Sequence, residues 1–103
     1  MGDALIQFKG SVYEKGYGQV AKMVLQDTNL TQTAKLLYAY LCTYGTGAFP
    51  SREKICTDLK ISKNRISVNM SSLVQNGYIT ITRIRESGRF THNVYNINLI
   101  KKK

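Results

Sequence analysis

Apolar residues recur at helical spacing in the stretch from Pro50 to Ile79, which predicts two short helices joined by a tight turn. The apolar face of the first helix is formed by Ile55, Cys56 and Leu59. The apolar face of the second helix is formed by Ile66, Met70, Leu73 and Val74. Because only a few residues separate the two helices, they are expected to pack as a helix-turn-helix.

Polar residues and a glycine mark the ends of both helices. Ser51 and Ser62 each precede a helix, where the hydroxyl can accept a hydrogen bond from a free backbone N–H of the first turn. Lys60 and Ile61 form the predicted turn, and Gly77 suits the left-handed position after the second helix. The outer face of the second helix begins with Lys63, Asn64 and Arg65. Its exposed positions after Arg65 are expected to be small and polar except for one valine, and they are Ser67, Val68, Asn69, Ser71, Ser72 and Gln75.

A longer helix is predicted before this pair. Thr31 is a favourable N-cap, and Leu30 stands where a hydrophobic staple packs against the helix start. The helix is expected to end at Gly45, and Phe49 in the loop beyond it is expected to anchor in the core. The apolar positions at helical spacing are Ala34, Leu37, Tyr38, Leu41 and Tyr44.

Two segments rich in β-branched residues and alternating in polarity follow the helix pair, at Tyr78–Glu86 and Phe90–Ile100. The residues between them, Ser87, Gly88 and Arg89, supply a turn, so the two segments predict a β-hairpin. Ile84 would point away from the core unless a bulge intervenes. Three helices followed by a hairpin predict an α+β winged helix-turn-helix with a C-terminal wing.

The N-terminal part is harder to interpret. Residues 20–26 predict a single helical turn, and residues 5–13 give a weak signal for an N-terminal strand. The whole chain, 1–103, is interpreted as one winged helix-turn-helix domain. In this interpretation 1–19 is a poorly defined N-terminal segment and 101–103 is a basic tail.

The positive charge is unevenly distributed along the chain. The net charge is +9, and residues 1–59 contribute only +1 of it, from six bases and five acids. Residues 60–103 contain nine bases and one acid, and therefore carry +8. This balance favours a polyanionic partner. No export signal and no apolar stretch of the roughly 20 residues that span a bilayer is found, which predicts a cytoplasmic protein without membrane contact.

The segment Leu30–Ile79 combines a helix rich in Leu and Tyr, a loop ending in Phe-Pro-Ser, and a helix pair ending in Gly-Tyr-Ile. In these features the chain resembles the winged helix-turn-helix domains of plasmid, phage and bacterial replication and regulatory proteins. The resemblance implies double-stranded DNA as the partner and no enzymatic activity. It further suggests an accessory protein of plasmid or mobile-element DNA processing, such as a relaxosome accessory protein acting at a conjugation or replication origin. A transcriptional repressor or regulator of the same fold is the alternative.

Ten residues are candidate DNA contacts. Basic side chains neutralise phosphates, and arginine can also bond a guanine edge through two parallel donors. The helix start contributes through its free backbone N–H groups as well, since these favour phosphate. The candidates are Arg52, Lys60, Lys63, Asn64, Arg65, Ser67, Arg83, Arg85, Arg89 and His92.

Other functions are less well supported by the residues. A metal-dependent nuclease needs clustered histidines or carboxylates, and this chain has one histidine and six scattered acids. No metal or cofactor is expected, and Cys42 and Cys56 are expected to be reduced and buried. A winged helix that binds protein remains an alternative, and RNA binding is disfavoured because no exposed aromatic platform is apparent. Other DNA-processing proteins at the same site are possible partners, and binding as a homodimer or side by side on repeats stays open.

Overall fold

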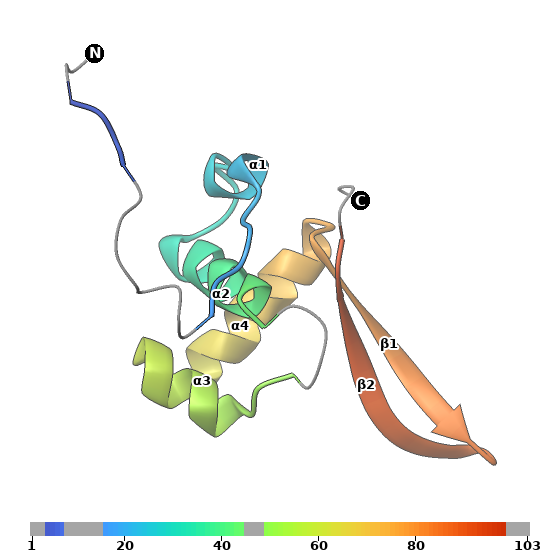
Figure 1. Ribbon diagram of the computed structural model, residues 1–103. Coiled ribbons are helices and arrows are strands. Elements are labelled where there is room, and N and C mark those ends of the chain that lie inside the picture. The colour runs from blue at the N-terminus through green and yellow to red at the C-terminus, as the bar shows by residue number, and fades with distance from the viewer. Residues whose placement is uncertain (1–3, 8–15, 45–48, 99–103) are drawn as a thin grey trace.

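The computed structural model describes residues 4–7, 16–44 and 49–98, without the side chains of residues 90–93. In chain order the elements are α1 (Lys22–Leu25), α2 (Gln32–Cys42), α3 (Arg52–Leu59), α4 (Lys63–Gln75), β1 (Ile79–Glu86) and β2 (Arg89–Ile97). Helices α2, α3 and α4 form the body, and the β1–β2 hairpin, here called the wing, projects from the end of α4 (Figure 1). The predicted α+β winged helix-turn-helix is confirmed.

Each of the three main helices begins at a hydroxyl residue, as predicted. The side-chain oxygens of Thr31, Ser51 and Ser62 accept hydrogen bonds from the backbone N–H three residues later, at 3.0, 3.1 and 3.2 Å. Each bond satisfies one donor that the first helical turn leaves unpaired. The helix ends are set by left-handed residues, Lys60 after α3 with φ of 57° and Gly77 after α4 with φ of 84°.

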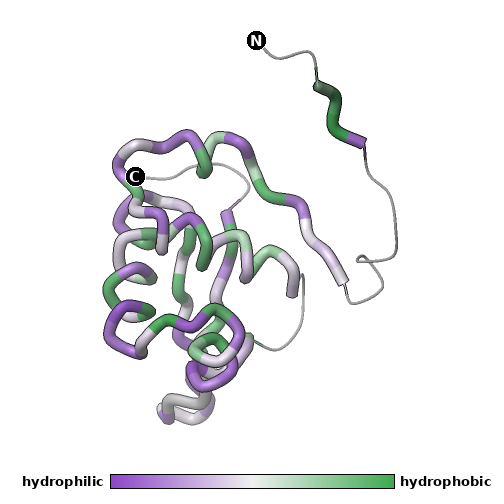
Figure 2. Tube along the Cα trace, turned by 90° about the vertical axis from the view of Figure 1, so that its left-hand side faces the viewer, coloured by the Kyte–Doolittle hydropathy of each residue, from purple (hydrophilic) through white to green (hydrophobic). Residues whose placement is uncertain are grey.

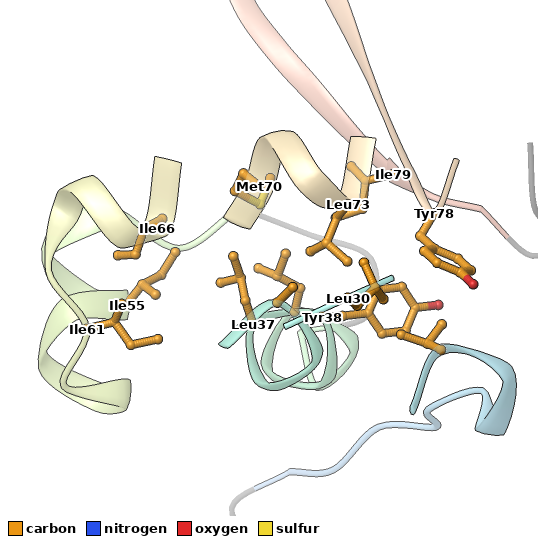
Figure 3. Close-up of a cluster of buried hydrophobic side chains, with 13 residues drawn as sticks. Leu30, Leu37, Tyr38, Ile55, Ile61, Ile66, Met70, Leu73, Tyr78 and Ile79 are labelled. Carbon is orange, nitrogen blue, oxygen red and sulfur yellow. The ribbon is translucent and has the colours of Figure 1, made fainter. Parts of the chain in front are cut away.

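The core lies where the three helices and the start of the wing meet. Ile55 and Ile61 pack against Ile66 between α3 and α4, and Leu37 of α2 lies below Met70 of α4 (Figure 3). All of these side chains are buried, and Ile79 at the base of β1 is buried with them. The apolar spacing seen in the sequence therefore defines the faces that pack.

The wing is an antiparallel ribbon closed by a two-residue turn. Glu86 pairs with Arg89, and Ser87 and Gly88 between them both have positive φ, 53° and 79°. Two positive φ values in a two-residue loop match the twist of the strands it joins. The register shifts between Ile84 and Arg85, where β2 supplies one extra residue, so the bulge lies on the opposite strand and β1 keeps its alternation.

The N-terminal predictions are tested only in part. Helix α1 is the single helical turn expected within 20–26, with Val24 buried. Residues 4–7 form no strand and lie apart from the helices (Figures 1 and 2). The rest of the predicted strand and the tail 101–103 lie outside the described residues. Gly45 lies outside them as well, but α2 ends at Cys42, three residues before the predicted stop.

Four predictions of burial were wrong. Asn69, expected on the outer face, is 6% exposed, whereas Val74, expected in the core, is 36% exposed at the edge of the buried face of α4. Phe49 is 37% exposed because its ring stacks on Tyr95 of β2, with centroids 4.0 Å apart, instead of entering the core. The fourth wrong prediction is that Cys42 and Cys56 are buried, because both free thiols are only half-buried. In the part of the chain that the structure describes, no helix is long and apolar enough to cross a membrane.

Candidate nucleic-acid interface

The outer face of α4 is the surface that a helix-turn-helix presents to DNA. Asn64, Val68, Ser71 and Gln75 follow one another at intervals of four, three and four residues, opposite the buried face that contains Ile66 and Leu73. All four are exposed or at the edge of the exposed face. None of them is charged, so the centre of this face offers hydrogen-bonding groups and one apolar group.

The basic residues of the helix pair lie at the edges of this face. Arg52 Nη1 donates to Ser67 Oγ at 2.8 Å, and Arg65 Nη2 donates to Thr33 Oγ1 at 2.7 Å. Each bond fixes the direction of a guanidinium group that has five donors, so most of its donors remain for phosphate oxygens. The predicted contacts Arg52, Ser67 and Arg65 are thus already linked to neighbouring elements.

Lys63 and Lys60 lie at the N-terminal end of α4. Lys63 Nζ is 3.3 Å from Glu53 Oε2 in an exposed ion pair. A backbone hydrogen bond of Glu53 itself, and then Lys63, hold the pKa of that carboxyl below its ordinary value. An exposed pair of this kind is weak, so Lys63 can exchange Glu53 for a phosphate at little cost. Lys60 is exposed in the turn.

A buried amide joins the start of α2 to α4. Thr31 Oγ1 donates to Asn69 Oδ1 at 2.6 Å, and Asn69 Nδ2 donates to the carbonyl of Arg65 at 2.7 Å. The same Thr31 oxygen caps α2 by accepting from Ala34 N. This network fixes the start of α4, which holds Asn64 and Arg65, against the first turn of α2. The helical position of Asn69 between Ile66 and Leu73 was the available signal for its burial.

A second polar link joins α2 to α3. Tyr40 Oη donates to Asp58 Oδ2 at 2.6 Å, and Lys54 Nζ lies 3.3 Å from the same oxygen. Burial and the hydrogen bond to Asp58 raise the pKa of Tyr40, whereas the bond from Tyr40, with a smaller effect of Lys54, lowers the pKa of Asp58. The phenol therefore stays protonated and the carboxyl ionised, which keeps this link intact near neutral pH.

The wing carries the second group of basic candidates. Arg83 and Arg85 lie on the face of β1 that begins at Ile79 and Ile81, and Arg89 begins β2 across from Glu86. All three arginines are exposed. His92 pairs with Ile84 in the ribbon, but its side chain lies outside the described part. The prediction that the buried face of β1 ends in a basic tip is confirmed by the burial of Ile79 and the exposure beyond it.

A groove separates the two basic groups. It has a volume of about 520 Å³ and runs between α4 and the wing, with Ser67, Ser71, Val74, Ile81 and Tyr95 among its lining residues. None of the described lining residues is acidic. The predicted contacts Arg52 and Ser67 line this largely apolar groove, and the wing arginines do not.

Among the described residues, no group of three histidine, cysteine, aspartate or glutamate side chains is arranged to hold a metal ion.

Comparison with known proteins agrees with this geometry. A family model described as a helix-turn-helix domain matches residues 28–79, which is just over half of the 103 residues and spans α2, α3 and α4. No curated protein and no solved structure matches the chain. A helix-turn-helix places its second helix in the major groove, so the match indicates DNA binding. The chain belongs to the helix-turn-helix domain family.

Proposed function

We propose that the protein binds double-stranded DNA sequence-specifically, with the start of α4 and the wing contacting the duplex together. One observation carries this proposal: exposed basic residues lie at the start of α4 and on the wing, and the groove between these two elements contains Arg52 and no acidic residue among its described lining residues. A duplex exposes phosphates on both borders of each groove. A helix in the major groove and a ribbon beside it can therefore be charged where each meets the backbone.

The two groups would play different roles. Arg52, Lys60, Lys63 and Arg65 lie around the N-terminal end of α4, where phosphate contacts would fix its orientation. The wing arginines can bond phosphates or enter a narrow minor groove, which attracts arginine in A·T-rich sequence. Base edges would be read by the exposed face of α4 and by the wing tip.

For the biological role, we propose an accessory protein of plasmid or mobile-element DNA processing that acts at a conjugation or replication origin. The likeness to replication and regulatory proteins of plasmids and phages supports this role, and a repressor of the same fold is the second candidate. The position of the DNA target distinguishes the two roles, because an accessory protein binds at an origin and a repressor binds at a site that overlaps a promoter. We propose no enzymatic activity, and cleavage of duplex DNA by the purified protein with Mg²⁺ would contradict this.

The test is selection of bound duplexes from a random pool, followed by titration of the selected sequence at several salt concentrations. A consistent motif, bound more tightly than scrambled DNA, is expected. A pool that does not converge, with affinity that falls steeply with salt, would indicate nonspecific binding instead. Weak binding that salt does not alter would favour a winged helix that binds protein.

The wing is tested by Arg85→Ala and Arg89→Ala. Each is expected to weaken binding to the selected duplex by about 1–3 kcal/mol if its guanidinium bonds a base. Arg85→Lys and Arg89→Lys are the matched controls, because lysine keeps the charge and loses the two-donor fork. If a lysine variant keeps the wild-type ratio of affinities for selected and scrambled DNA, the arginine that it replaces contacts phosphate alone. Unchanged affinity in both alanine variants would remove the wing from the interface.

A further inference from the structure

Val68 is the most exposed apolar side chain on α4. It is 66% exposed, and the other exposed valine of this helix, Val74, lies at the edge and lines the groove beside the wing. Asn64 precedes Val68 by four residues and Ser71 follows it by three, so polar side chains flank it along the helix. Val68 therefore lies on the outer face of α4, opposite the buried side chains of Ile66 and Leu73.

The fold gains little from a valine at this position. A β-branched side chain loses rotamer freedom in a helix, and an exposed one gains little burial in return. Single exposed apolar residues are common on protein surfaces, so exposure alone decides nothing. The position of Val68 is what points to a function, because Val68 lies in the middle of the face that a helix-turn-helix inserts into the major groove.

In the major groove only one of the four unmodified bases offers an apolar group, the C5 methyl of thymine. The neighbours of Val68 fit an A·T pair in a second way. Guanine is most often read by two donors from arginine or lysine, and the central positions Asn64, Ser71 and Gln75 have neither. Asn64 and Gln75 instead carry amides, which can bond the N6 and N7 atoms of adenine.

We propose that Val68 is a specificity-determining residue that packs against the C5 methyl of a thymine in the DNA target. This inference rests on the proposed function, because it requires α4 to enter the major groove. Lys63 and Arg65 of α4, with Arg52 of α3 beside them, hold the helix on the phosphates, and Val68 selects the base below it.

The experiment replaces each thymine of the selected duplex by uracil, one at a time, which removes the methyl group and leaves the base-pairing edge unchanged. The wild-type protein is expected to lose about fourfold in affinity at one thymine, which is the effect of returning one methyl group to water. Val68→Ala is expected to bind the thymine duplex about as weakly as the wild-type protein binds the duplex with uracil at that position. Its affinity is expected not to change further when that thymine is replaced by uracil. If Val68 contacts this methyl group directly, the effects of Val68→Ala and of the uracil replacement are not additive.

Val68→Ala is suited to this test because the Val68 side chain is exposed and alanine is a better helix former than valine. Leu36→Ala is the matched control, since Leu36 is an exposed apolar residue of α2, and it should keep the full response to uracil. If no thymine responds, or if Val68→Ala responds like the wild type, the inference is overturned while sequence-specific binding stands. If no sequence is selected from the pool at all, the proposed function itself fails.

Discussion

The side chain of Asn69 shows how one polar residue can belong to a helix core. Its amide oxygen and nitrogen are both engaged, by Thr31 and by the carbonyl of Arg65, so burial leaves neither atom unpaired. Both bonds act on the N-terminal half of α4, which is the half that holds Asn64 and Arg65. The position of α4 against the start of α2 therefore depends on this amide.

Replacing Asn69 by alanine is expected to lower the free energy of unfolding by about 1–3 kcal/mol. The reason is that the Thr31 hydroxyl loses its acceptor in a partly buried place. Urea unfolding at neutral pH measures the change. Ser71→Ala, on the exposed face of the same helix, is the control and should stay within about 0.5 kcal/mol of the wild type. A loss equal to that of Ser71→Ala would show that the Asn69 bonds add no stability.

At this scale the sequence misleads where residue type and position disagree. Asn69 is polar but lies at a helical position between Ile66 and Leu73, and the position prevailed because Thr31 from a distant segment satisfies the amide. Val74 is apolar but lies at the edge of the buried face, next to the wing. The helical position of Asn69 was a signal that the sequence offered, whereas its partner Thr31 and the neighbours of Val74 belong to other elements and could not be read from the chain.

The turn between α3 and α4 contains a lysine in a conformation that glycine adopts more easily. Lys60 has φ of 57° and ψ of 48°, and its backbone N–H bonds to the carbonyl of Cys56 to end α3. An L-residue with a side chain costs about 1–2 kcal/mol in the left-handed region. The presence of lysine here agrees with a role for its charge near the phosphates.

Lys60→Gly and Lys60→Ala form a pair that separates conformation from charge. Both remove the ammonium group, so both are expected to weaken DNA binding equally, because one phosphate is no longer neutralised. Only the glycine variant relieves the left-handed backbone, and it is expected to gain about 1 kcal/mol in the free energy of unfolding over the alanine variant. Thermal unfolding and DNA titration of the two proteins give the two quantities. Wild-type affinity in both would exclude Lys60 from the interface.

The elements were largely predictable because each carries local signals. These signals act within a few residues of the chain. They are the caps at Thr31, Ser51 and Ser62, the glycine that ends α4 at Gly77, and the alternation of polarity in the wing strands. The stacking of Phe49 on Tyr95 was not predictable, since it joins a loop to a strand more than forty residues later. For the same reason the sequence did not reveal the groove between α4 and the wing, which needs both elements in place.

Across the whole molecule the two halves of the chain share the core, but the net positive charge lies almost entirely on the second half. The net +8 of residues 60–103 falls on the turn, α4, the wing and the tail, whereas residues 1–59 are nearly neutral and contain α2 and α3. The winged helix-turn-helix fold and the family were predictable from the apolar spacing, the caps and the alternating strands, and the charge indicated a polyanionic partner. The ten DNA contacts, the single-domain interpretation of 1–103 and the accessory role stay predictions, because they concern a partner or the extent of the chain.

Replacing Arg83, Arg85 and Arg89 together by alanine is expected to reduce the salt dependence of DNA binding. Each phosphate that the protein no longer neutralises lowers the slope of log K against log salt by about 0.9, so the triple variant should reduce it by about 2.7 if all three arginines bind phosphate. Titrations between low and moderate salt measure the slope. Lys22→Ala with Lys35→Ala removes two charges from the nearly neutral half and should leave the slope unchanged. An equal reduction in that control would mean that net charge, and not the wing, governs binding.

The wing has a consequence for how such a protein could diverge. Only its base, at Ile79, is buried in β1. Beyond the point where Phe49 stacks on Tyr95, the strands are held by each other and by the Ser87–Gly88 turn (Figure 1). Adding or removing two residues from each strand would keep every side chain on its present face and move the arginines at the tip by about 7 Å. No side chain of the helical body would need to change. Descendants of this chain could therefore lengthen or shorten their footprint on a duplex while inheriting the same core.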